Sequence, residues 1–195
     1  SYTQGLGRRI ANGFDDVLGA IEQDIRVDVP FVHRVDRFDL PGRVVTDTEY
    51  AQAKAMCDTL DAKEKMVGSD WWNRHFWGYV VSRYDAQKKG EPRYPVEMHV
   101  LRLGDLAIAT NPFELYLDYG VQIEGRSSAP QTMLIQLAAP LDFAYYLPTP
   151  RAVAAGGYSA AVTHNLVGPE GGQALVDRTV DAIEQLWPKP VSEVK

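Results

Sequence analysis

Few features of this sequence belong to a specialised class of protein. Its 195 residues contain a single cysteine, Cys57, so no internal disulfide can brace the fold. The longest apolar runs, such as Ala152–Ala155, are far too short to span a membrane. No basic run stands out, and 26 acidic against 20 basic residues give a net charge of −6, which argues against nucleic acid as a partner. Composition alone therefore indicates an ordinary acidic α/β domain.

Motifs that identify a class of catalyst are equally scarce. No H-E-x-x-H and no paired cysteine motif is present, and no two of the four histidines share a helical turn (His33, His75, His99 and His164). There is no G-x-S-x-G nucleophile elbow, and Cys57 lies on the apolar stripe of a predicted helix, where packing is its expected role. The glycine-rich stretch 168–172 contains an acidic residue, so we interpret it as a loop-to-helix junction rather than a phosphate site.

Apolar residues recur at helical spacing in several segments. This pattern predicts helices over residues 3–25, from about Thr46 onward, over about 70–89, and over 172–187. Thr46 and Glu49 have the spacing of a capping box. Two prolines end the last helix, and residues 188–195 are expected to form a loose tail.

Elsewhere the period changes to two, which is typical of strands. Predicted strands cover 27–40 at a sheet edge, 94–103 and 106–109 as a hairpin around Gly104-Asp105, and 132–137 as a buried strand. A helix over 111–125 would connect the last two strands, and a short helix is expected over 150–155. These elements predict an α/β fold in which a mixed sheet with an antiparallel hairpin packs against several helices. Residues 1–187 would form a single α/β domain or the carboxy-terminal portion of a larger domain.

The stretch 101–114, L-R-L-G-D-L-A-I-A-T-N-P-F-E, carries a strand directly to a helix start. Asn111 can be an N-cap, Pro112 the first helical residue, and Glu114 the third, so that Glu114 closes a capping box. Alternatively, Glu114 is a functional carboxylate at the carboxyl end of a strand, where sites cluster in α/β folds. The local physics favours the cap.

A second stretch, 142–149, has the sequence D-F-A-Y-Y-L-P-T and is followed by Gly156-Gly157-Tyr158. A loop this rich in aromatic residues lines a groove or plugs a core. In order and spacing, the two stretches resemble the later part of the catalytic domain of neutral/alkaline ceramidases, in particular bacterial members of unassigned substrate. The matching pattern is L-R-x-G-D-L-A-I…P-x-E, an apolar strand, Y-[IL]-P-T, G-G-Y and a final amphipathic helix, and it covers residues 94–187.

The resemblance implies a zinc-dependent amide hydrolase. In that family zinc activates water to hydrolyse the amide bond of ceramide, with two histidine ligands from the earlier half of the domain and a glutamate and a tyrosine from the later half. By the motif, the metal ligands here are Glu114 and Tyr146, and Tyr145 and Tyr158 are expected to contact a small-molecule amide or lipid-like substrate. The histidine ligands and the catalytic serine segment are absent from this sequence, so we expect no catalytic residue in it and no activity from it alone. The expected partner is the upstream half of the same hydrolase domain, and family analogy places the protein in the periplasm or outside the cell.

Two other interpretations remain open. In the first, the family fold serves binding or scaffolding instead, because Phe113 stands where ceramidases have glycine and Asn111 suits a plain helix start. Ser1 is also a conceivable N-terminal nucleophile that uses its own α-amine.

The resemblance makes a geometric prediction that separates these interpretations. The carboxylate of Glu114 and the phenol of Tyr146 should face one concave, polar pocket, because the strand 132–137 should lie beside the strand 106–109. The capping interpretation instead predicts a hydrogen bond from the Asn111 backbone N–H to Glu114, with Tyr146 packed elsewhere.

Overall fold

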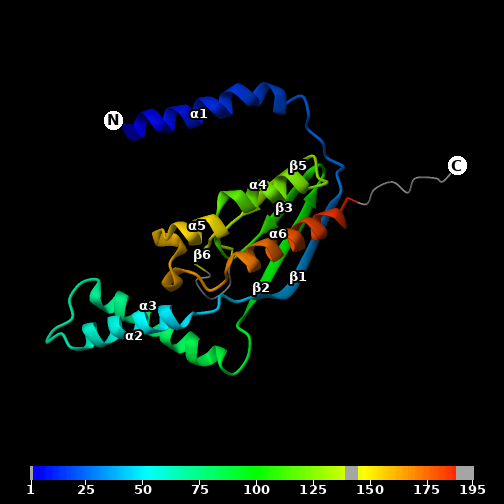
Figure 1. Cartoon of the computed structure of the whole chain (residues 1–195). Helices are drawn as coiled ribbons and strands as arrows, with labels where there is room; N and C mark the ends of the chain where they lie inside the picture. The colour runs from blue at the N-terminus through cyan, green and yellow to red at the C-terminus, as the bar shows by residue number, and fades with distance from the viewer. Residues whose placement is uncertain (1, 139–144, 188–195) are drawn as a thin grey trace. The chain divides into compact units, whose positions relative to one another are not determined.

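The computed structural model describes residues 2–138 and 145–187 of the chain (Figure 1). The chain divides into two compact units, residues 1–30 and residues 31–195. The first unit contains α1 (Tyr2–Ile21), which ends at Ile21 rather than at residue 25 as predicted. Within the described residues 2–30, α1 is the one helix and no strand is present. Ser1 and the predicted loose tail lie outside the described residues.

The second unit is built on a four-stranded mixed sheet. Its strands are β1 (Phe31–Pro41), β2 (Arg93–Leu103), β3 (Leu106–Thr110) and β5 (Gln131–Ile135), in the order β1-β2-β3-β5. β2 pairs antiparallel with both β1 and β3, whereas β3 and β5 are parallel. Gly104 turns the β2–β3 hairpin with a φ of 59°, a conformation that favours glycine. The predicted mixed sheet, its antiparallel hairpin and the edge position of the first strand are thus confirmed.

The helices α4 (Leu117–Arg126) and α6 (Pro169–Glu184) pack against one face of this sheet. α4 is also the crossover between the parallel strands β3 and β5. The prediction of a buried strand at 132–137 was wrong, because β5 is at the sheet edge and turns Met133 and Ile135 outward from the covered face, both about half exposed. An apolar composition cannot tell which face of a strand is covered.

The core between the sheet and these helices is apolar. Its largest fully buried side chains are Leu40, Met98, Val100, Phe113, Ile123, Leu147, Val167, Leu175, Val176 and Ile183. α6 begins at Pro169, three residues before the predicted start. The stretch 168–172 is a loop-to-helix junction, as predicted, with Gly168 at the N-cap. A Cβ on Gly171 would lie 2.1 Å from Val167 Cγ1, so a glycine there permits close packing.

The helices α2 (Asp47–Asp61) and α3 (Asp70–Gln87) pack on each other around a second, smaller core of Val45, Ala53, Val80 and Val162. The predicted capping box is present: the Thr46 hydroxyl accepts from Glu49 N at 3.2 Å, and Thr46 N donates to Glu49 Oε2 at 2.9 Å. Cys57 is 6% exposed on the inner face of α2, which confirms its packing role.

Short elements complete the second unit. They are β4 (Glu114–Leu115), β6 (Tyr146–Leu147), α5 (Pro150–Ala155), η1 (Tyr158–Ala160) and η2 (Val162–His164). The short helix predicted over 150–155 is present with these bounds, and the Thr149 hydroxyl accepts from Ala152 N at 3.3 Å at its N-cap. Among the described residues, no helix is both long and apolar enough to cross a membrane.

Candidate functional site

The segment between β3 and α4 does not form the predicted helix start. α4 begins at Leu117, and the Asn111 side chain accepts from Phe113 N at 3.1 Å instead of capping a helix. Asn111 N donates to Ile135 O at 2.9 Å, so it is not available to Glu114 as the capping interpretation required. Phe113 is fully buried in the main core and thereby anchors this turn. The capping-box prediction for Asn111, Pro112 and Glu114 is therefore wrong.

Glu114 instead lies in a two-residue strand that pairs with the chain around Tyr146. β4 and β6 are parallel, and Glu114 is the register partner of Tyr146. The pairing is held by Glu114 N to Tyr145 O at 3.0 Å and Tyr116 N to Leu147 O at 3.4 Å. Register partners on parallel strands project to the same face. The structure thus brings together the two residues that the resemblance named as metal ligands.

The two side chains interact directly. A hydrogen bond to the Glu114 carboxylate raises the pKa of the Tyr146 phenol, with smaller contributions from burial and from the negative charge of Glu114. Both side chains are half-buried. An acceptor that is ionised forms a stronger hydrogen bond than a neutral one, so this contact fixes the two oxygens relative to each other.

Aromatic rings flank this pair on one side. The Tyr146 ring meets the Tyr158 ring edge-on at a centroid distance of 6.2 Å, and Tyr158 lies 4.3 Å from the His164 ring. Phe76 of α3 contacts both His164, at 5.4 Å, and Tyr145, at 6.1 Å. Tyr158 remains 71% exposed, so one wall of the cluster is open to a ligand. Both tyrosines that were predicted to contact substrate belong to this cluster, although their role stays a prediction.

The backbone of Tyr145 is in the left-handed region, with a φ of 60°. This conformation is costly for a residue with a large side chain and persists only where neighbouring contacts enforce it. Here Tyr145 O accepts from Glu114 N, and Tyr145 forms a bridge with Asn165. The turn therefore delivers the Tyr146 side chain next to Glu114.

The cluster includes residues that the sequence did not single out as part of a site. His164 donates to or accepts from the Thr163 hydroxyl through Nδ1 at 2.8 Å, and burial lowers its pKa. The Tyr116 hydroxyl hydrogen-bonds the Ser159 hydroxyl at 2.6 Å. A lone histidine and a lone serine carry no motif, so only their position after G-G-Y could have drawn attention to them.

Two other places in the second unit bring polar or charged side chains together. On the sheet face opposite α4 and α6, His33 Nε2 and His99 Nδ1 are 2.9 Å apart, and His99 Nε2 is 3.2 Å from Glu97. Within residues 2–138 and 145–187, no group of three histidine, cysteine or acidic side chains is arranged to hold a metal ion. The assignment of Glu114 and Tyr146 as zinc ligands stays a prediction.

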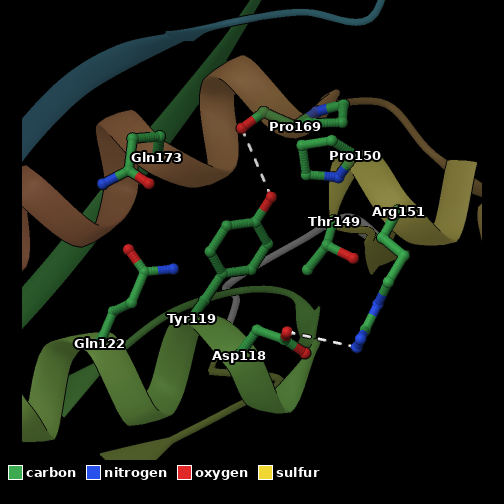
Figure 2. Close-up of a pocket in the computed structure, with 8 residues that line it drawn as sticks. All are labelled: Asp118, Tyr119, Gln122, Thr149, Pro150, Arg151, Pro169 and Gln173. Carbon is green, nitrogen blue, oxygen red and sulfur yellow. Dashed lines mark hydrogen bonds and ion pairs between the residues drawn. The ribbon is translucent and has the colours of Figure 1, made fainter.

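An open hollow of about 420 Å³ lies between α4, α5 and α6 (Figure 2). Its lining includes Tyr119, Gln122, Gln173 and an ion pair between Asp118 and Arg151 with an N–O distance of 3.5 Å. None of the four predicted site residues lines it. The concave pocket expected at Glu114 and Tyr146 is thus not this hollow.

Comparisons with known proteins relate the fold to one group of enzymes. Neither a scan against models of protein families nor a search of curated proteins finds a match. Among similar solved structures, neutral ceramidase from Pseudomonas aeruginosa is 19% identical with a TM-score of 0.51, over 89% of this chain and 31% of that one. A ceramidase complexed with C2 is 22% identical with a TM-score of 0.40, over 53% of this chain and 16% of that one. The chain has a ceramidase-like fold and spans less than a third of the length of either structure.

Proposed function

We propose that this chain is the carboxy-terminal portion of a neutral ceramidase-like, zinc-dependent amide hydrolase domain. The observation that carries the proposal is the register pairing of Glu114 with Tyr146 on β4 and β6, although the two residues are 32 positions apart in the sequence. The Glu114 carboxylate is also the main cause of the raised pKa of Tyr146. The ceramidase-like fold supports it independently. The substrate would be a small-molecule amide or a lipid-like amide, and the complete protein would work in the periplasm or outside the cell.

The chemistry of these two donors suits zinc, but their number does not complete a site. A carboxylate oxygen is an ordinary zinc ligand, and a nearby dication favours the deprotonated form of a phenol. A catalytic zinc needs three protein ligands. The remaining ligands would be the two histidines expected from the upstream half of the domain, so this chain alone should be inactive. Bound zinc would supply a Lewis acid that polarises an amide carbonyl and activates water.

The described residues would hold the zinc ion and contact the substrate. Glu114 and Tyr146 would hold the ion through a carboxylate oxygen and the phenol oxygen. Tyr158, with its exposed ring beside Tyr146, would contact the substrate, and Tyr145 would bring that wall into contact with Phe76 of α3.

Zinc content of the full-length protein tests this assignment. Stoichiometric zinc is expected in the wild type and in Glu124→Ala, which removes an exposed carboxylate of α4. Glu114→Ala should lose the zinc, and Tyr146→Phe should bind it more weakly because the ring stays but the donor oxygen is gone. Equal stoichiometric zinc in the wild type and Glu114→Ala would exclude Glu114 as a ligand.

A second candidate function is a binding or scaffold domain that keeps the same fold without catalysis. The specific observation in its favour is that Glu114 and Tyr146 satisfy each other by a hydrogen bond. A full-length gene with no histidines in the earlier half of the domain would support this alternative. Full-length protein that binds zinc and hydrolyses an amide would rule it out.

A further inference from the structure

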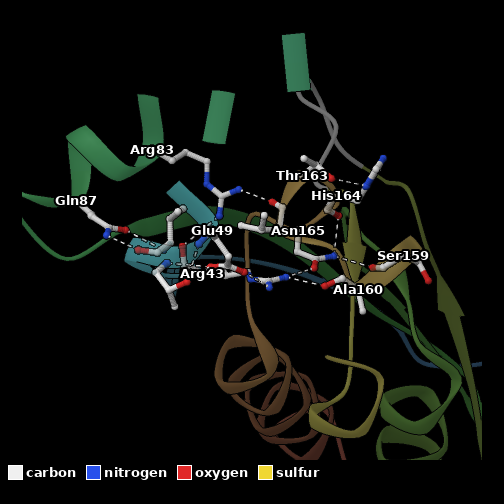
Figure 3. Close-up of polar contacts among 12 residues, drawn as sticks. Arg43, Glu49, Arg83, Gln87, Ser159, Ala160, Thr163, His164 and Asn165 are labelled. Atoms are coloured by element: carbon white, nitrogen blue, oxygen red, sulfur yellow. Dashed lines mark hydrogen bonds and ion pairs between the residues drawn. The ribbon is translucent and has the colours of Figure 1, made fainter. Parts of the chain in front are cut away.

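Asn165 occupies a central place behind the candidate site. Its side chain is completely buried, and Nδ2 donates to three backbone carbonyls. Two of them are Ser159 O and His164 O, both at 2.8 Å (Figure 3). The third is Tyr146 O at 3.2 Å. Each of these carbonyls belongs to, or directly follows, a residue whose side chain lies in the aromatic cluster. A single amide group therefore fixes three points of the backbone that carries the cluster.

Arg43 hydrogen-bonds the oxygen of the Asn165 side-chain amide. Its Nη1 donates to Asn165 Oδ1 and, at 2.9 Å, to Ala160 O, while Nη2 donates to Glu49 Oε1 at 2.8 Å (Figure 3). Glu49 is in turn fixed by the capping box of α2. The Arg43 side chain is only 13% exposed, so little water competes for these bonds. The amide orientation of Asn165 is thus set by a charged partner and not by its acceptors alone.

A neighbouring arginine braces the same segment. Arg83 of α3 donates to Val162 O at 2.9 Å and to Arg43 O at 3.2 Å. Arg43 N also donates to Leu166 O at 2.8 Å. The loop around η1 and η2 is consequently tied to both helices of the smaller core.

We propose that Asn165, oriented by Arg43, is a positioning residue that sets the placement of Tyr146 and its aromatic flank relative to Glu114. This inference rests on the proposed function for its biological meaning. The reason is geometric: the Tyr146 carbonyl is adjacent to the Cα that bears the phenol, and Tyr158 precedes Ser159. Without the amide, three part-buried carbonyls lose a donor, and the segments that bear Tyr146, Tyr158 and His164 lose their common anchor.

Solution NMR of the full chain without metal tests the inference. In the wild type, ring protons of Tyr146 and Tyr158 should show mutual NOEs, and the Glu114 and Tyr116 amides that pair β4 with β6 should be protected from exchange. Asn165→Asp keeps an acceptor for Arg43 but removes the three donated bonds. We expect the ring-to-ring NOEs to weaken and exchange of these two amides to accelerate at least about tenfold relative to β2–β3 amides.

Thr179→Val is the matched control. Thr179 is buried in α6 and hydrogen-bonds Leu175 O and Met98 Sδ, away from the Arg43–Asn165 contact. It should lower global stability while leaving the NOEs and the relative exchange of Glu114 and Tyr116 unchanged. Arg43→Lys keeps the charge but loses the guanidinium fork, and it should reproduce the Asn165→Asp effect in weaker form.

Each outcome decides the inference. Folded Asn165→Asp with wild-type NOEs and exchange would overturn it, and so would the same result for Arg43→Lys if Asn165→Asp did not fold. The wild type provides a measurement that needs no variant: the Asn165 side-chain amide protons should exchange as slowly as the Glu114 amide. Exchange as fast as that of the exposed Asn73 side chain would overturn the inference.

These readouts do not depend on zinc. If they succeed and the zinc test fails, Asn165 positions a Glu114–Tyr146 pair that has another role. If zinc binds through Glu114 but the readouts fail, only the positioning role is lost.

Discussion

Tyr119 on α4 and Tyr146 on β6 both have raised pKa values, but their surroundings raise them for different reasons. Tyr119 is 2% exposed, and burial, assisted by the negative charges of Glu170 and Asp118, raises its pKa to about 12. Its hydroxyl donates to Pro148 O at 2.9 Å and lies 3.4 Å from Pro169 O. Tyr146 is half-buried, and the main cause of its raised pKa is the hydrogen bond to Glu114.

The difference separates a buried phenol that bonds main-chain carbonyls from a half-buried phenol whose partner is a carboxylate. The Tyr119 proton is committed to main-chain carbonyls, and its ring fills the space between α4 and the start of α6. The Tyr146 proton is shared with an acidic side chain beside an exposed aromatic wall. A raised pKa alone therefore does not identify a functional tyrosine, because two different surroundings raise the pKa in this chain.

Truncation of the Tyr119 and Tyr146 rings should give the largest difference in the free energy of unfolding. Tyr119→Ala should lower the free energy of unfolding by about 3–5 kcal/mol, because it removes a buried aromatic ring and leaves Pro148 O without its donor. Tyr146→Ala, at a half-buried position, should cost about 1 kcal/mol. Urea unfolding of both variants measures this difference. Equal losses would mean that Tyr146 is as much a part of the core as Tyr119.

A substitution that crowds the Tyr119 ring should have the next largest effect on the free energy of unfolding. A Cβ on Gly172 would lie 2.4 Å from the Tyr119 hydroxyl oxygen and from Cζ, so Gly172→Ala should destabilise the chain by about 1–3 kcal/mol. Gly157→Ala is the control beside the candidate site, because its Cβ would meet nothing within 4 Å and should change stability by no more than about 0.5 kcal/mol. Thermal or urea unfolding compares the two. An equal effect of the two variants would show that the start of α6 can shift away from Tyr119.

The sequence predicted the features that neighbouring residues determine, and it missed those that depend on distant parts of the chain. The capping box at Thr46, the hairpin turn at Gly104 and the stripe of α6 are set by neighbouring residues, and all three were predicted. Asn111-Pro112 looked equally local, yet the helix starts at Leu117. The backbone there pairs with distant groups instead: Glu114 N with Tyr145 O, and Leu115 N with Gln136 Oε1 at 2.6 Å. Non-local pairing of this kind overrides a local cap preference.

The candidate site shows the same limit. The order of two motifs pointed to Glu114 and Tyr146, and the structure places them side by side, but their role as metal ligands stays a prediction. Asn165 had no signal at all, because its acceptors are a carbonyl 19 positions away and two nearby carbonyls that only the fold turns toward it. Buried amide contacts of this kind have no spacing rule by which a sequence would reveal them.

Alkaline pH should destabilise the folded chain through deprotonation of the buried Tyr119 phenol. Because its folded pKa of about 12 lies above its usual value of 10, the associated stability is fully present below pH 10 and is lost as the pH rises toward 12. Tyr119→Phe should therefore flatten this part of the stability profile. Tyr2→Phe, at a residue that is 90% exposed, should keep the wild-type slope. Urea unfolding from pH 9 to pH 12 measures the profiles, and a wild-type slope in Tyr119→Phe would contradict the expected role of burial.

The smallest effect on the free energy of unfolding is expected at acidic pH. It concerns His164, which lies in the aromatic cluster beside Tyr146. Burial lowers the pKa of His164, whose ring lies between the rings of Tyr158 and Phe76 and hydrogen-bonds the Thr163 hydroxyl. The folded state therefore prefers neutral His164, so its contribution to stability is present above the usual histidine pKa of 6.5 and is lost as the pH falls through the lower, folded value. His164→Gln should remove this acid dependence, whereas His75→Gln, at an exposed position of α3, should retain it. Unfolding free energies measured at a series of pH values below 7.5 would show the His164→Gln profile flatter than the wild type. Parallel profiles would mean that the ring takes up a proton in place, and that the aromatic wall beside Tyr146 is more open to water than the Tyr119 region.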